Sequence, residues 1–150
     1  PAQDELFITN YGAHRIIKRQ LSTGNFTGML SGAKTGWDTT LQQSIVRSAN
    51  AGGLDSPRGI AIDSTYIYTS EEVNHRVSRW QRSNGNYAGH IGGNRAGWHT
   101  DTTPAASSKE SFRYPAGLAV DGTWIYVADR QNQRISRWKL SDGSFGGYTD

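Results

Sequence analysis

The chain contains no cysteine among its 150 residues, and it contains a single methionine and four prolines. The absence of cysteine excludes a disulfide framework and any thiolate metal site. No apolar stretch approaches the roughly 20 residues that a membrane-spanning helix needs. Acidic and basic residues are nearly balanced, with a formal net charge of +3. The composition therefore permits an anionic partner without requiring one.

Glycine and aromatic residues, in contrast, are plentiful, with 18 glycines, seven tyrosines and five tryptophans. These residues favour strands and tight turns over helices. Hydrophobic residues make up 35% of the sequence, which is enough for one continuous core. The composition indicates a single domain rich in strands.

The sequence repeats itself with a long period. Arg15, Arg76 and Arg134 stand in equivalent settings, 61 and 58 positions apart, and residues 57–90 align with residues 115–148 without a gap. A fixed period of this kind is typical of stacked supersecondary units that bury a core only against their neighbours. The sequence therefore predicts a repeat architecture.

The middle copy of the repeat predicts four short strands. They span residues 59–62, 66–69, 75–80 and 87–91, which are separated by turn residues. The Asn-Gly pair at 84–85 favours a tight hairpin between the last two strands. Four antiparallel strands in each repeated unit predict an all-β chain built from β-propeller blades.

The units resemble NHL repeats, a family of propeller blades named for an Asn-His-Leu type motif. The segments that carry the resemblance run from Asp129 to Ile135 and from Glu71 to Val77. The first copy is more degenerate, with Asn10 in place of the acid. The resemblance covers nearly the whole chain and implies a propeller of six blades.

The register of the repeat predicts about three blades, the first of which lacks its innermost strand. The blades span residues 4–31, 57–92 and 114–150, joined by connections at 32–56 and 93–113. Three blades cannot close a ring, because each end blade would expose an apolar face. Either the chain is the front part of a longer propeller, or two copies close a six-bladed ring together. We favour the homodimer.

The repeated arginines are interpreted as structural. An acid lies five positions before two of them, which predicts charge-assisted pairs between Glu71 and Arg76 and between Asp129 and Arg134. Arg15 has the same place in the first copy. A residue that recurs in successive blades is expected to stabilise each blade, whereas a single ligand site is usually built from residues that differ between blades.

Two tryptophans at equivalent positions in the connections are candidates for ligand recognition. Loops of this length without strand character are typical of functional segments. In an up-and-down sheet, the loops after the second and fourth strands emerge on the same face. The predicted ligand-binding residues on this face are Trp37, Trp98, His99, Tyr11, Glu72 and Arg130. The alternative is that each tryptophan folds back to fill a gap between blades.

No catalytic residue, metal site or cofactor is predicted. The sequence has no Gly-x-Ser-x-Gly elbow, phosphate-binding loop or cysteine nucleophile, and its four histidines lack metal-ligand spacing. A metal held on the central axis by symmetry-related loops is an alternative. Some propellers similar to this one are lyases or hydrolases, but the positions expected to line the inner strands, such as Gly59 and Gly117, are small.

We therefore expect a non-enzymatic binding module that recognises a protein or glycan partner, in an extracellular or cell-envelope location. The alternative is a nucleic-acid-binding propeller. Lys18, Arg79 and Arg137 align across the repeats as a basic stripe, and loop cations would add to this face, namely Arg58, Lys34, Arg95 and Arg113. Some proteins with NHL repeats bind single-stranded RNA on a basic face. A third class is an assembly element whose main partner is its own copy.

Overall fold

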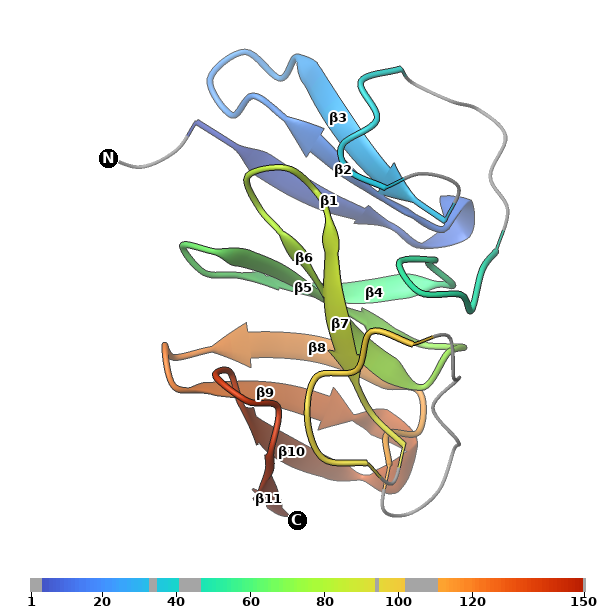
Figure 1. The fold of residues 1–150 in the computed structure, drawn as a ribbon, viewed down its shortest axis with the longest axis vertical. Coiled ribbons are helices and arrows are strands. Elements are labelled where there is room, and N and C mark those ends of the chain that lie inside the picture. The colour runs from blue at the N-terminus through green and yellow to red at the C-terminus, as the bar shows by residue number, and fades with distance from the viewer. Residues whose placement is uncertain (1–3, 33–34, 41–46, 94, 102–110, 150) are drawn as a thin grey trace.

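The computed structural model describes residues 4–32, 35–40, 47–93, 95–101 and 111–149. In these residues the chain forms three antiparallel sheets, of three, four and four strands. The second sheet lies between the first and the third, so that the sheets form a stack in chain order (Figure 1). The fold is all-β, as the repeat predicts, and the three sheets are the blades.

Each blade is an up-and-down meander. Blade one contains β1 (Leu6–Asn10), β2 (Arg15–Arg19) and β3 (Phe26–Ser31). Blade two contains β4 (Pro57–Ile62), β5 (Tyr66–Glu71), β6 (Arg76–Gln81) and β7 (Tyr87–Ile91). Blade three contains β8 (Pro115–Val120), β9 (Trp124–Asp129), β10 (Arg134–Lys139) and β11 (Phe145–Thr149). Two short 3-10 turns, η1 (Tyr11–Ala13) and η2 (Arg130–Asn132), connect the middle strands of blades one and three.

The strand registers show that the repeat positions are equivalent in space. Ile67 lies opposite Trp80 in blade two, and Ile125 lies opposite Trp138 in blade three. Blade one has the same register on its first two strands. The described strands of blade one therefore correspond to the second, third and fourth strands of the other blades. No helix in the described part of the chain is long and apolar enough to cross a membrane.

The first strands of blades two and three, β4 and β8, pack against each other. Gly59 permits the contact, because a Cβ at this position would lie 2.1 Å from the carbonyl oxygen of Ala116. The Ser70 hydroxyl donates to the same carbonyl and accepts from the Gly59 N–H at 2.8 Å. The absence of a side chain at Gly59 thus permits the close approach of the two blades here.

The hydrophobic core lies between neighbouring blades. One cluster of buried side chains joins blade one to blade two, and contains Phe7, Ile16, Leu30, Leu54, Ile67 and Trp80. A second joins blade two to blade three, and contains Tyr68, Val77, Ile91, Phe112, Ile125, Val127, Trp138 and Leu140. The blades therefore bury apolar faces against their neighbours, as expected for a repeat fold, with Leu54 and Phe112 of the connections added to the two clusters.

Candidate interaction face

The acid, asparagine and arginine of the repeated motif form a buried network in blade two. Glu71 accepts from Arg76 Nε at 2.7 Å and from the Asn74 amide at 2.6 Å, and the side chains of Glu71 and Arg76 are fully buried. Arg76 also donates to three carbonyls of the incoming connection, at residues 49, 50 and 53. Burial opposes the charge of Arg76, but Glu71 outweighs it and raises the pKa of the guanidinium.

Blade three contains the second predicted pair. Arg134 Nε lies 2.9 Å from Asp129 Oδ2, and Asn132 donates to the same oxygen at 2.8 Å. Blade one has no equivalent acid, and the Arg15 guanidinium lies 4.0 Å from the sulfur of Met29. In blades two and three the motif thus forms hydrogen bonds between the blade and the connection that precedes it. These bonds agree with a structural role for the repeated arginine.

The histidine of the motif joins one blade to the next. His14 Nδ1 accepts from the backbone N–H of Ser56 at 2.9 Å, and His75 Nδ1 accepts from that of Tyr114 at 3.2 Å. Ser56 and Tyr114 each precede the proline that opens a blade, and both have positive φ angles, of 53° and 54°. Burial and the nearby charge of Arg113 lower the pKa of His75, which favours the neutral ring that can accept this bond.

One end of the sheets carries a row of contacting side chains from all three blades. At its centre is Glu72, whose side chain is 7% exposed and which pairs with Arg58 Nη1 at 2.7 Å and with Arg130 Nη2. The Arg58 guanidinium lies 6.0 Å from the ring centre of Tyr11, and that of Arg130 lies 5.9 Å from the ring centre of Tyr114. We call these five residues the inter-blade row.

The inter-blade row has the chemistry of an anion-binding surface. Arg58 and Arg130 are nearly half-exposed and share one buried carboxylate, so the group has a net charge of +1. Each guanidinium has five N–H donors, and the pairing with Glu72 holds both in place for a planar acceptor such as a carboxylate. Tyr11 is 48% exposed and adds an aromatic ring beside them.

Three of the six predicted ligand-binding residues, Tyr11, Glu72 and Arg130, therefore lie together. Sequence reasoning did not place Arg58 and Tyr114 with them. Their place in the row could have been inferred from their position next to the repeated prolines that open blades two and three. These prolines lie at the end of the sheets where the loops after the second strand also emerge.

Trp98, however, does not lie on this face, so its predicted location is wrong. After β7 the chain turns back and forms an antiparallel bridge between His90 and His99, in place of a free loop. This return carries the indole toward the β10–β11 turn, at the opposite end of blade three. There Trp98 Nε1 donates to the carbonyl of Leu140 at 3.1 Å, and the ring centre lies 5.9 Å from that of Tyr68.

Trp37 repeats this arrangement one blade earlier, and its predicted location is wrong for the same reason. Asp38 bridges back to Met29 of β3. Trp37 Nε1 then donates to the carbonyl of Arg82 at 3.1 Å, and its ring centre lies 5.8 Å from that of Phe7. Both tryptophans fill the gap between two blades, which was the alternative interpretation of the sequence.

His99 likewise lies away from the inter-blade row. It is half-buried, and its backbone exchanges two hydrogen bonds with His90, each of 2.8 Å. Its Nε2 atom is buried and has no hydrogen-bond partner in the described part of the chain. The neighbouring His90 is fully buried with Nδ1 2.7 Å from the Tyr87 hydroxyl, and burial lowers the pKa of His90 to about 4. These histidines are packing residues.

The predicted basic stripe is not a continuous exposed surface among the described residues. Arg79 packs between the rings of Tyr66 and Trp98, with its guanidinium 4.5 and 4.0 Å from their centres, and burial lowers its pKa. Lys18 lies over Trp37. Arg137 alone of the three is exposed. Lys18 and Arg79 therefore pack against the indoles between neighbouring blades, whereas Arg137 contacts Trp124 of its own blade.

The described fold is that of part of a β-propeller. No family model matches the chain, and no curated protein sequence matches it. Hydrazine synthase from Kuenenia stuttgartiensis is similar in structure, with a TM-score of 0.64 and 15% identity over 97% of this chain and 32% of that one. The WD40 repeats of RRP9 follow with a TM-score of 0.60, 15% identity, and coverage of 97% and 34%.

An auxiliary nutrient binding protein from Bacteroides thetaiotaomicron is also similar, with a TM-score of 0.54 and 16% identity over 98% of this chain and 35% of that one. The chain thus spans about a third of the length of these structures. At these identities the likeness shows the fold alone.

Proposed function

We propose that the chain is a non-enzymatic binding module of the NHL-repeat type, which recognises an acidic segment of a protein partner through the inter-blade row. The observation that carries the proposal is the pair of half-exposed arginines, Arg58 and Arg130, held by the buried carboxylate of Glu72. The motif that joins the blades, Asn74-His75-Arg76 with Glu71, is what favours the NHL type over other propeller repeats.

A protein partner fits the row better than a glycan does. Glycan recognition relies on exposed aromatic faces, and the two indoles expected to supply them are packed between blades. The arginines of the row, in contrast, present fixed N–H donors at a spacing set by one carboxylate. Prior fixation lowers the entropy that a side chain loses on binding, and therefore favours capture of an aspartate or glutamate.

The binding experiment uses a fluorescent poly-glutamate peptide and an oligouridine of equal charge, with fluorescence anisotropy as the readout. The test variant combines Arg58→Gln, Arg130→Gln and Glu72→Gln, so that no buried carboxylate is left without its partners. We expect its affinity for the peptide to fall roughly tenfold or more, since each charge-assisted contact stabilises a complex by more than about 1 kcal/mol.

The matched control is Lys139→Gln, which removes one exposed cation at the opposite end of blade three. It should bind the peptide like the unmodified chain. Equal peptide affinity of the triple variant and the unmodified chain would contradict the proposal. Tighter binding of oligouridine, with an affinity that falls steeply with salt, would instead favour the nucleic-acid alternative.

A further inference from the structure

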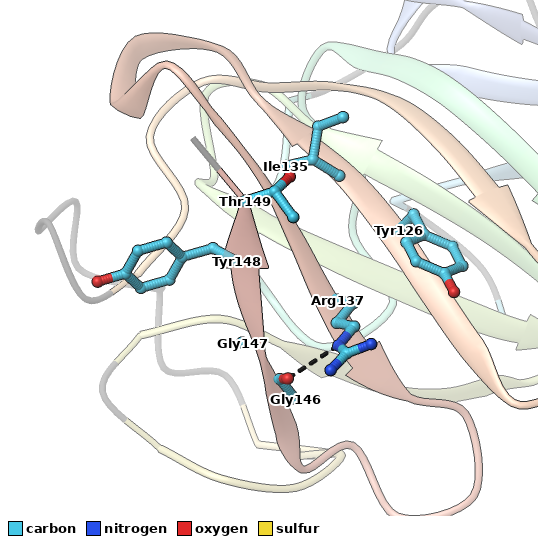
Figure 2. Close-up of a pocket in the computed structure, with 7 residues that line it drawn as sticks. All are labelled: Tyr126, Ile135, Arg137, Gly146, Gly147, Tyr148 and Thr149. Atoms are coloured by element: carbon cyan, nitrogen blue, oxygen red, sulfur yellow. Dashed lines mark hydrogen bonds between the residues drawn. The ribbon is translucent and has the colours of Figure 1, made fainter.

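Blade three has an outward sheet face on which no described residue packs as a further blade. Ile135 on this face is 50% exposed. It borders a hollow of about 340 Å³ that is also lined by Tyr126, Arg137, Thr149 and neighbouring residues of β11. Figure 2 shows Ile135, Tyr126 and Arg137 projecting on the same side of the sheet. An apolar surface of this kind, rimmed by polar groups, marks an interaction site.

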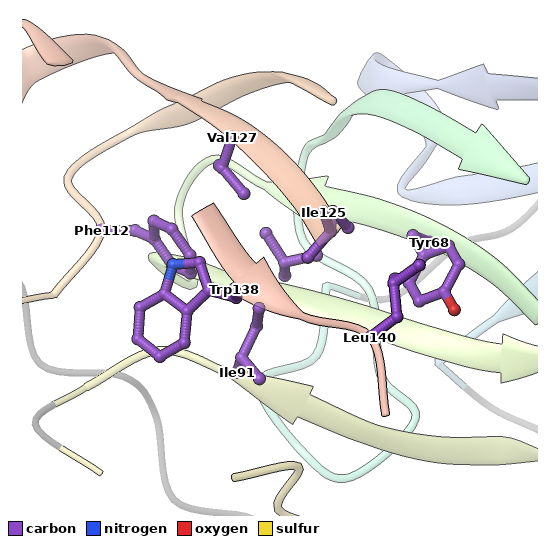
Figure 3. Packing of buried hydrophobic residues seen from close by; sticks show 8 residues of the cluster. Tyr68, Ile91, Phe112, Ile125, Val127, Trp138 and Leu140 are labelled. Carbon is purple, nitrogen blue, oxygen red and sulfur yellow. The ribbon is translucent and has the colours of Figure 1, made fainter. Parts of the chain in front are cut away.

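The contact between blades two and three shows which residues cover the equivalent face of blade two. Tyr68, Val77 and Ile91 of blade two are the repeat equivalents of Tyr126, Ile135 and Thr149. All three are buried in the cluster that joins blade two to blade three, where Figure 3 shows Tyr68 and Ile91. Val77 is fully buried, whereas Ile135 is half-exposed. The residues that cover them belong to the next blade, and they are Ile125, Val127, Trp138 and Leu140.

Among the described residues, blade one also has an open face. Leu6 and Leu21 are the repeat equivalents of Ile125 and Leu140, the covering residues of blade three. They are 39% and 61% exposed, while Ile125 is fully buried. Ile8, two positions after Leu6, is 38% exposed beside them. Blade one therefore repeats three of the four covering positions with apolar residues, and it has Arg19 in the place of Trp138.

We propose that the open face of blade three is covered by blade one of a second copy of this chain, so that two such joints close a ring of six blades. The joint repeats the contact between blades two and three. By that equivalence Tyr126 of one copy lies near Leu21 of the other, because Tyr68 and Leu140 both adjoin Trp98 in the internal contact.

A single copy cannot make this joint with itself. Blades one and three lie on opposite sides of blade two, so their open faces cannot meet within one copy (Figure 1). A second copy brings both complementary faces, and a two-fold arrangement uses each face once. The joint does not depend on whether the inter-blade row binds an acidic partner.

The absence of cysteine makes the joint directly testable by cross-linking. In the variant Leu21→Cys with Tyr126→Cys, a short bis-maleimide should link the two positions between copies. We expect a covalent dimer on a denaturing gel, and light scattering of the unmodified chain should give twice the 16.5 kDa chain mass. The control pair, Leu21→Cys with Arg113→Cys, places the second thiol near the inter-blade row and should not be linked.

A second variant tests the face without cross-linking. Ile135→Asp puts a charge on an exposed position, so the chain should still fold, and it should be monomeric by light scattering. Ile135→Val introduces the residue found at the equivalent position of blade two and should remain dimeric. A monomeric unmodified chain, or equal cross-linking of the test and control pairs, would overturn the joint. A ladder of larger covalent species would support the joint and overturn the closed ring.

Discussion

At the scale of single residues, the repeat offers its own comparison, because one position carries different chemistry in different blades. The Glu71–Arg76 pair of blade two is fully buried, whereas Arg134 in blade three is 12% exposed beside Asp129. A buried ion pair is stabilising only while both charges and their hydrogen bonds are present. Removing only one partner of the buried pair should therefore lower the free energy of unfolding strongly.

Replacing Arg76 by leucine should destabilise the chain strongly. The change leaves Glu71 buried without its main charge partner and frees three carbonyls of the incoming connection. We expect the free energy of unfolding to fall by about 3–5 kcal/mol in urea titration. Arg134→Leu, the matched change in blade three, should cost less because Asp129 can regain water. Equal losses for the two variants would contradict the role assigned to burial.

Replacing Tyr87 and His90 by the residues at the equivalent positions of blade one, Tyr87→Phe and His90→Met, should make stability less dependent on pH. Burial lowers the pKa of His90 to about 4 in the folded chain, from an ordinary value of 6.5. Between these values the unfolded chain binds a proton that the folded chain does not. Stability is therefore complete above about pH 6.5 and falls as the pH drops toward 4.

The measurement for this pair is urea unfolding at pH 7.5 and pH 4.5. We expect the unmodified chain to lose roughly 2–3 kcal/mol more than the double variant over this interval. His75, whose pKa burial also lowers, should leave a smaller loss of the same sign in both proteins. Identical pH profiles of the two proteins would show that His90 does not titrate on unfolding as described.

At the scale of elements, the connections after β3 and β7 are part of the blades that they follow. Each returns along the last strand by one bridge, at Asp38 or His99, and places an indole in the gap between two blades. The aligned cations Lys18 and Arg79 lie over these indoles. Cation, indole and carbonyl together join neighbouring blades at the end opposite the inter-blade row.

Trp98→Ala should therefore reduce stability. The indole is half-buried and loses its contacts with Tyr68 and Arg79, so we expect a loss of roughly 2–4 kcal/mol in urea titration. Trp37→Ala should cause a similar loss at the preceding joint, while affinity for the poly-glutamate peptide stays unchanged in both variants. An unchanged free energy of unfolding with lost peptide binding would restore the recognition role of the tryptophans.

The sequence was sufficient to predict the strands, the blades and the motif pairs. The reason is that they depend on local patterns, such as alternating residues, an Asn-Gly turn, and an acid five positions before Arg76. The positions of Trp37 and Trp98 were not predictable, because they depend on a backbone return that has no distinct pattern. The pairing of Arg58 with Glu72 was not predicted either, since it joins residues 14 positions apart that meet through the register of β4 on β5.

At the scale of the whole molecule, stability should depend on the concentration of the chain. If two copies cover each other's open faces, folding and association are linked, and mass action raises the melting temperature with concentration. We expect a higher melting temperature at 100-fold greater concentration for the unmodified chain, and no such rise for Ile135→Asp. A melting temperature independent of concentration in both proteins would contradict association through blade three.

The two faces of blade two differ in chemistry, because Arg76, Ser78 and Trp80 alternate along β6 with Val77 and Arg79. Contacts between blades consequently have a direction: the face of one blade packs against the opposite face of the next. A copy with an intact face on blade one and a damaged face on blade three would still form one joint with a normal copy. The second joint would not form, so the ring would stay open. In a mixture of normal and damaged chains, the fraction of closed rings should thus fall by more than the fraction of damaged chains, because one damaged copy is enough to keep a ring open.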